Sequence, residues 1–136
     1  HDIGKISIPS EILTKPGILS DLEKEIIKTH CKVAKDLISD IEFPYPVAEI
    51  IYQHHERMDG SGYPCGLTGN EVSIEARIIA VADVVDAMAS YRPYRPALGM
   101  NAAIDEIVKF RDIKYDPQVV DACLKLYKRT EQDKLN

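Results

Sequence analysis

The sequence predicts an all-α domain. Ser20 and Glu23 form a Ser-x-x-Glu capping box, a pattern that marks the start of a helix. Apolar residues then recur at helical spacing, and residues 78–85 are apolar on nearly every side, as expected of a central helix. With 136 residues, 45% of them apolar, the chain is large enough for one domain with its own core.

The first helix is expected to run from Ser20 to about Ser39. Its apolar stripe contains His30 together with Leu22, Ile26, Val33, Ala34, Leu37 and Ile38. Pro44 and Pro46 interrupt the chain, and a second helix follows whose apolar face leads directly to the pair His54-His55. A turn-rich, glycine-containing loop comes next, over residues 59–69.

Three further helices complete the expected bundle. One covers residues 74–90, and the next is capped by Asn101 and ends near Phe110. Asp116 and Pro117 are a suitable N-cap and first residue for the last helix. The segment after Arg129 is polar and expected to fray, so we predict a domain over residues 1–130 and a polar tail over 131–136.

Charge and composition exclude several classes of protein. The net charge of −5 disfavours binding to duplex nucleic acid, which rewards a basic face. No apolar run approaches the roughly 20 residues of a membrane span, and no signal peptide pattern is present, so direct membrane insertion is not expected. Cys31, Cys65 and Cys123 are odd in number and widely spaced, which favours free thiols over disulfides or a cysteine-based zinc site.

All four histidines stand where a metal site would use them. His1 is followed by Asp2, His30 lies in a helical stripe, His54 and His55 are adjacent, and Asp83 interrupts an apolar helix. Imidazole and carboxylate together suit a centre of two or three transition metals. Taken singly, His30 also fits a core histidine and Asp83 a capping or ion-paired carboxylate, so the residues alone leave both interpretations open.

Other residues suit an anionic ligand. Arg92 and Arg95 lie three residues apart in a proline-stiffened segment and can form a fork for phosphate oxygens, although a solvated turn explains them equally. Lys5 adds a positive charge near His1, and Asp86 follows Asp83 by three residues. In the glycine loop, Tyr63 offers a ring for stacking, although the loop can also be a simple connector.

Five segments together resemble the HD-GYP family of bacterial metal-dependent phosphodiesterases. They are residues 1–6, which begin His1-Asp2; residues 54–64, which end in Gly62-Tyr63-Pro64; and residues 76–83, 92–95 and 115–117. The resemblance covers essentially the whole chain in register. It implies an HD-domain-like helical bundle around a metal centre that cleaves the bacterial second messenger cyclic di-GMP to pGpG, GMP or both.

The resemblance also implies roles for individual residues. Asp2, Asp83 and Lys5 would be catalytic, with Lys5 at the reacting phosphate or the nucleophilic water, and the substrate would contact Tyr63, Asp86, Arg92 and Arg95. The metals would be two ions, iron or manganese, held by His1, Asp2, His30, His54, His55 and Asp83. The mechanism implied is metal-assisted hydrolysis of a phosphodiester.

Two departures from the family pattern bear on activity. The family has further ligands, typically a Glu and a His, on a helix before the His-Asp dyad, and that helix is missing here, so a third metal is not expected. Ala34 stands where the family usually has glycine.

The alternatives to an active cyclic di-GMP phosphodiesterase are a catalytically inactive module that binds cyclic di-GMP or a partner signalling protein, and a phosphohydrolase that acts on another nucleotide.

The family resemblance finally implies a cellular setting. Domains of this kind usually end a longer signalling protein, so we expect a cytoplasmic location, with a possible tether to a membrane sensor. The expected partners are cyclic di-GMP, a diguanylate cyclase domain and an upstream sensor or receiver domain.

Overall fold

The structure is a computed structural model that describes residues 1–90 and 98–133. It confirms the all-α prediction, because the described residues contain helices and two isolated bridges but no strand. Arg92 and Arg95 lie outside the described residues, as do residues 134–136 of the expected tail. The elements are η1 (Ile3–Ser7), α1 (Ser10–Leu13), α2 (Asp21–Lys28), α3 (His30–Ile38), α4 (Val47–Tyr52), η2 (Gly69–Glu71), α5 (Ile74–Ala89), α6 (Met100–Lys109) and α7 (Pro117–Asp133).

The helix expected over residues 20–39 is two helices that meet at Thr29. Its predicted start is confirmed, because the Ser20 amide donates to Glu23 Oε2 at 2.7 Å and the Glu23 amide donates to Ser20 Oγ at 3.3 Å. At the junction, the Thr29 hydroxyl donates to the Ile26 carbonyl and the His30 ring contacts the Ile27 carbonyl. Side chains therefore occupy carbonyls that a continuous helix would use, which accounts for the break.

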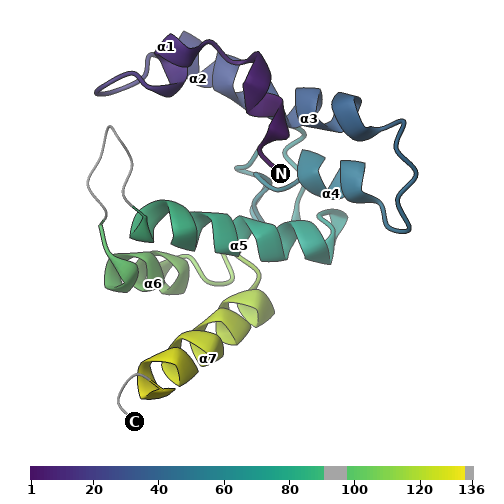
Figure 1. The fold of residues 1–136 in the computed structure, drawn as a ribbon. Coiled ribbons are helices and arrows are strands. Elements are labelled where there is room, and N and C mark those ends of the chain that lie inside the picture. The colour runs from purple at the N-terminus through teal and green to yellow at the C-terminus, as the bar shows by residue number, and fades with distance from the viewer. Residues whose placement is uncertain (91–97, 134–136) are drawn as a thin grey trace.

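The N-terminal elements form one side of the molecule. η1 packs on α3, and α3 packs on α4, with the N-terminus between them and above α5 (Figure 1). Gly4 permits the first contact, because a Cβ at this position would collide with the carbonyl oxygen of His30 and approach the Ala34 amide at 2.7 Å. A glycine is thus required in η1 for His1 and Asp2 to reach the start of α3.

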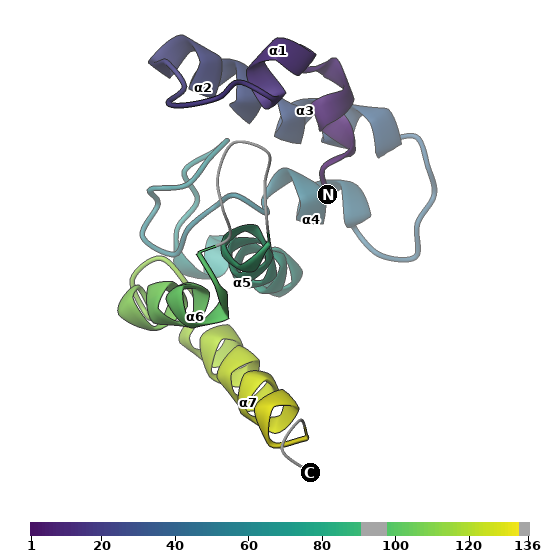
Figure 2. The ribbon, with the colours of Figure 1, turned by 60° about the vertical axis from the view of Figure 1, so that its left-hand side comes forward.

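Helices α5, α6 and α7 form the other side of the molecule. In Figure 2, α6 and α7 lie below α5, away from the layer of α1, α2 and α3. Their shared apolar core consists of Val81, Ile107, Tyr115, Val119 and Val120. Asp116 begins α7 as predicted: its Oδ1 accepts from the Gln118 amide at 2.8 Å, and its Oδ2 accepts from Arg77 at 2.9 Å.

Several sequence expectations for these helices need correction. The fourth predicted helix begins at Met100 with Gly99 at its N-cap, so Asn101 is inside the helix; Gly99 has φ 91°, which glycine adopts easily. The last helix continues past Arg129 to Asp133, so the boundary expected at residue 130 falls inside α7. Helix α5 is less enclosed than expected, because Ile78 is 50% exposed.

No helix within the described residues is both long enough and apolar enough to cross a membrane.

Candidate metal centre

Four segments bring the predicted histidines and two carboxylates into one cluster. His30 begins α3, His54 and His55 directly follow α4, His1 and Asp2 precede η1, and Asp83 extends from α5. The centroid of the His54 ring lies 4.8 Å from that of His1, 5.3 Å from that of His30 and 4.0 Å from that of His55. Carboxylate oxygens of Asp2 and Asp83 each lie 3.7 Å from His1 Nε2, so the structure brings the six predicted metal-site residues together although His1 and Asp83 are far apart in the sequence.

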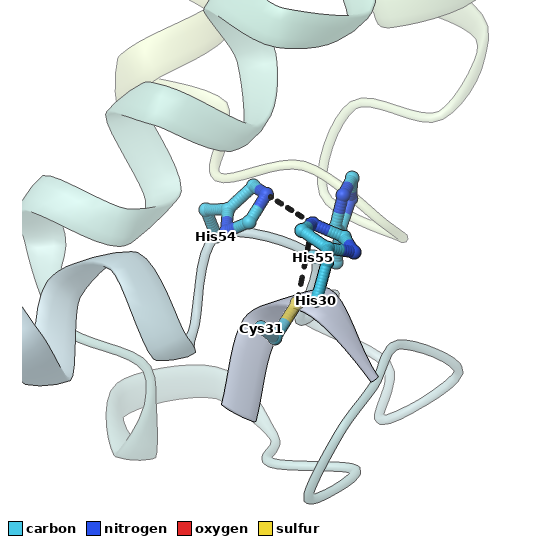
Figure 3. Close-up of side chains that lie close together, drawn as sticks. All are labelled: His30, Cys31, His54 and His55. Atoms are coloured by element: carbon cyan, nitrogen blue, oxygen red, sulfur yellow. Dashed lines mark hydrogen bonds between the residues drawn. The ribbon is translucent and has the colours of Figure 1, made fainter. Parts of the chain in front are cut away.

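Backbone carbonyls fix the tautomers of two buried histidines. His30 Nδ1 lies 2.7 Å from the Ile27 carbonyl oxygen, and His54 Nδ1 lies 2.6 Å from the Ile51 carbonyl oxygen. A carbonyl oxygen only accepts, so each Nδ1 carries the proton. In a neutral ring the Nε2 atom then carries the lone pair, and the Nε2 atoms of His30 and His54 face one another at 3.4 Å (Figure 3). Metal-binding histidines are held in this way by a hydrogen bond from the other ring nitrogen.

A protonated imidazole is a poor alternative at this point. Burial lowers the pKa of His54 and lowers the pKa of His55 to about 2, and the neighbouring histidines add to the effect on His55. The rings of His54 and His55 are therefore neutral at physiological pH. A neutral imidazole offers a nitrogen lone pair that a metal cation can accept. The donor set thus fits a metal ion.

Asp2 lies between two of the histidines. Its Oδ1 is 3.8 Å from His30 Nε2, and its Oδ2 is 3.7 Å from His1 Nε2. Lys5 donates to Oδ2 at 2.7 Å. Burial pushes the pKa of Asp2 upward, but the hydrogen bond and charge of Lys5 outweigh it, so the net pKa lies below the ordinary value. Asp2 is an ionised carboxylate whose two oxygens serve different histidines.

The two acidic residues of α5 differ in position. Asp83 Oδ1 is 3.7 Å from His1 Nε2, and the Asp83 side chain is 20% exposed, so it borders the cluster and is less buried than its apolar neighbours in the sequence suggested. Asp86 is exposed and accepts a hydrogen bond from the Ser90 hydroxyl at 3.2 Å. The structure records no contact between Asp86 and the cluster, and its predicted substrate role stays a prediction.

Tyr63 covers the outer side of the histidine pair. Its ring stacks on His55 with centroids 4.7 Å apart, and Lys28 Nζ lies 5.5 Å from the same ring. Burial raises the pKa of the Tyr63 hydroxyl above its usual value, so the phenol is neutral. Gly62 makes this placement feasible, because a Cβ there would come within 2.5 Å of the His55 carbonyl oxygen.

Sequence reasoning missed a buried glutamate that holds the Tyr63 loop. Glu56 is 2% exposed, and its carboxylate accepts from the amides of Cys65 at 2.7 Å and Leu67 at 3.0 Å. It thereby fastens the loop of residues 57–69 to the end of α4. The available signal was a charged residue directly after a histidine pair on an apolar face, which is costly to bury without partners.

Cys31 is the second residue that the sequence analysis did not connect to the site. Its Sγ lies 3.6 Å from His30 Nε2 (Figure 3), and its side chain is fully buried. Burial, with the charges of Asp2 and Glu56, raises the pKa of the Cys31 thiol to about 12. All three cysteines are free, as predicted. Cys31 directly follows His30 in the sequence, and this adjacency was the signal that could have linked it to the site.

Comparison with known families agrees with this geometry. Residues 1–119 match the model of a family described as the HD domain. The chain belongs to the HD domain family. That membership confirms the fold expected from the motifs, and a metal-binding cluster within the fold is consistent with it.

Curated relatives share most of this chain's length. A cyclic di-GMP phosphodiesterase response regulator of Xanthomonas campestris is 46% identical over 134 residues, which are 97% of this chain and 35% of the relative. A cyclic di-GMP phosphodiesterase of Thermotoga maritima is 48% identical over 130 residues, 94% of this chain and 35% of the relative. A 3'3'-cGAMP-specific phosphodiesterase of Vibrio cholerae is 42% identical over 105 residues, 77% of this chain and 24% of the relative. The chain therefore spans about a third of the length of the first two.

Proposed function

We propose that this chain is a metal-dependent phosphodiesterase that hydrolyses cyclic di-GMP. The observation that carries the proposal is the pair of buried histidines, His30 and His54, whose carbonyl-bonded Nδ1 atoms leave both Nε2 atoms facing one another next to Asp2. The names of relatives that are 46% and 48% identical support the substrate. We further propose two metal ions, iron or manganese.

The residues divide naturally between two ions. His30, His54 and His55 would hold one, and His1 and Asp83 the other, with one oxygen of Asp2 available to each group. A pair of divalent cations stabilises the attacking and leaving oxygens of a phosphodiester displacement. The neutral state of His54 and His55, a result of burial, keeps their lone pairs free for ligation at neutral pH.

Other residues would position and neutralise the substrate. Lys5, which now pairs with Asp2, places a positive charge where it can stabilise developing charge on a phosphoryl oxygen. Tyr63, stacked on His55, offers an aromatic edge at the border of the cluster for a nucleobase. Arg92 and Arg95 are proposed to hold phosphate oxygens, and Asp86 to contact the ligand.

The decisive experiment measures turnover of cyclic di-GMP by the purified chain loaded with iron(II) or manganese(II). Asp83→Ala is expected to reduce metal-dependent turnover by more than about 100-fold, because even groups behind a ligand cost 10–100-fold when removed. Asp105→Ala, at an exposed position of α6, is the matched control and should retain parental turnover. Turnover by Asp83→Ala at the parental rate would refute the role of Asp83.

The same assay also tests whether residues upstream of His1 supply further metal ligands. A version extended upstream by about 40 native residues, enough for one or two helices, is assayed in parallel. Activity of the extended version alone would show that further ligands are needed for catalysis. Inactivity of both versions, each with metal bound, would favour the regulatory module instead.

A second substrate is favoured by one observation. Three Vibrio cholerae relatives, 34% to 42% identical to this chain, are named as phosphodiesterases specific for 3'3'-cGAMP. Both cyclic dinucleotides therefore belong in the assay, and the ratio of their kcat/KM values decides between them. We expect cyclic di-GMP to be preferred, because the relatives named for it that we cite are more similar to this chain.

The cellular setting remains part of the proposal. One relative is named as a response regulator, which supports a receiver domain as the upstream partner of this domain. We propose a cytoplasmic location and regulation by an attached sensor or receiver domain, or by a diguanylate cyclase partner.

A further inference from the structure

Cys31 occupies a position that suits a metal ligand. It is the second residue of α3, directly after His30, and its side chain is fully buried. Candidate ligand atoms from four residues, His30, Cys31, His54 and His55, all lie within 4.8 Å of one another. Figure 3 shows the sulfur on the same side of α3 as the facing imidazoles of His30 and His54. Three nitrogens and one sulfur at such spacing resemble the donor set of a four-coordinate site.

The candidate ligand atoms of the cluster already lie close to one another. The Cys31 sulfur is 3.6 Å from His30 Nε2, and His54 Nε2 faces the same nitrogen at 3.4 Å. The Nδ1 atoms of both rings point to backbone carbonyls, so the Nε2 atoms are the ones directed into the cluster. A cation placed among them would take electron pairs from the nitrogens and the sulfur together.

The second group of candidate ligands differs in chemistry. His1, Asp2 and His54 form another set whose ligand atoms lie within 4.8 Å, and Asp83 approaches His1 from α5. That set contains nitrogen and oxygen only. Thiolate ligands favour softer ions such as iron or zinc, whereas carboxylate and water suit manganese or magnesium. The two halves of the centre therefore offer different preferences.

We propose that Cys31 supplies a sulfur ligand to the ion held by His30, His54 and His55, and thereby makes this half of the centre select iron(II) or zinc over manganese and magnesium. On binding, the thiol proton leaves to solvent and the sulfur donates its electron pair to the metal. The inference rests on the metal centre of the proposed function but concerns metal selection rather than turnover.

The test uses cobalt(II) and zinc as probes with the same purified chain. Bound cobalt is expected to show a sulfur-to-cobalt charge-transfer band in the near ultraviolet, and X-ray absorption of bound zinc a sulfur neighbour at about 2.3 Å. Cys31→Ser and Cys31→Ala should both lose this signature and lower the ratio of zinc to manganese affinity by about tenfold or more. The matched controls are Cys123→Ser, at a partly buried position, and Cys65→Ser, at an exposed position, and both should keep the sulfur signature.

The outcomes separate this inference from the proposed function. A parent protein that binds zinc or cobalt through nitrogen and oxygen alone overturns the role of Cys31 and leaves the histidine centre intact. A parent that binds no metal overturns both. Since the parent spectrum alone decides the ligand set, misfolding of a Cys31 variant, monitored by circular dichroism, does not weaken the test.

Discussion

The two sides of the molecule bury different kinds of side chain. Between η1, α3 and α4, the fully or nearly fully buried residues include His30, Gln53, His54 and Glu56. Among α5, α6 and α7, the core is formed by Val81, Ile107 and Val120 with two further apolar residues. Both sides bury apolar residues, among them Ala34, Ile50 and Ile51 on the first, but the first side also buries several polar side chains that are held by hydrogen bonds.

The difference shows how the buried polar side chains of a site are held in place by specific hydrogen bonds. Ile27 and Ile51 contribute backbone carbonyls that orient His30 and His54, and Gln53 accepts from the Ser73 amide at 2.9 Å, which ties the end of α4 to the start of α5. Each polar group is placed by a specific partner, whereas aliphatic residues tolerate repacking. We therefore expect mutations among α5, α6 and α7 to lower stability without changing metal binding, and mutations among η1, α3 and α4 to affect metal binding as well.

The largest loss of stability is expected from Ile107→Ala. Ile107 is fully buried in α6, and truncating such a residue typically costs about 2–5 kcal/mol through lost burial and the cavity left behind. Denaturant unfolding measures the loss, and Val108→Ala, at the exposed neighbouring position, is the control. Metal bound per folded chain should stay unchanged. A metal content that falls with the folded fraction intact would show that the two sides are coupled more strongly than their cores suggest.

A smaller loss, located on the site side, is expected from Glu56→Ala. The variant leaves the amides of Cys65 and Leu67, in a partly exposed loop, without their acceptor, and each lost hydrogen bond costs about 0.5–1.5 kcal/mol. Faster hydrogen exchange at these two amides should accompany the loss, together with weaker metal binding as Tyr63 loosens from His55. Glu71→Ala, which removes an exposed glutamate of η2 at the end of this loop, should have the smaller effect. Equal effects of the two variants would contradict the anchoring role of Glu56.

Local patterns predicted those parts of the fold that depend on local chemistry. Both Ser20 and Asp116 were identified as caps from neighbouring residues alone, and both make the expected hydrogen bonds. The break at Thr29 was missed, because it depends on side chains that bond to carbonyls of the preceding turn, and helical periodicity does not register this. The exposure of Ile78 was also missed, since periodicity shows which residues are apolar and not which neighbours cover them.

The candidate site was predicted as a set of residue types but not as a geometry. Histidines and aspartates are conspicuous in a sequence, and the structure brings His1, His30 and Asp83 together as a metal centre would require. Cys31 and Glu56 escaped notice although each directly follows a predicted histidine ligand. Sequence adjacency does not show that the thiol points toward the His30 ring or that the carboxylate accepts from two loop amides, because both depend on side-chain direction in the folded chain.

The smallest loss of stability is expected on the side formed by α5, α6 and α7, where Asp116 is buried. Burial pushes the pKa of Asp116 upward, but the hydrogen bonds from Arg77 and from the amides of Gln118 and Val119 lower it below its ordinary 3.8. The carboxylate therefore stabilises the fold above pH 3.8, and this contribution disappears as the pH falls through the lower pKa of the folded state.

Asp116→Asn tests that linkage. At pH 7 the variant should unfold more easily by about 0.5–1.5 kcal/mol, because asparagine can still cap the helix but its neutral side chain loses the ion pair with Arg77. The difference between parent and variant should shrink as the pH is lowered below 3.8, because the parent loses its charge there and the amide has none to lose. Asp121→Asn, which removes an exposed partner of Arg111, should give a smaller difference in the same urea titrations. A gap between Asp116→Asn and the parent that stays constant down to pH 2 would contradict the role of the charge. It would mean that the hydrogen-bond geometry of the carboxylate, and not its charge beside Arg77, accounts for the contribution of Asp116.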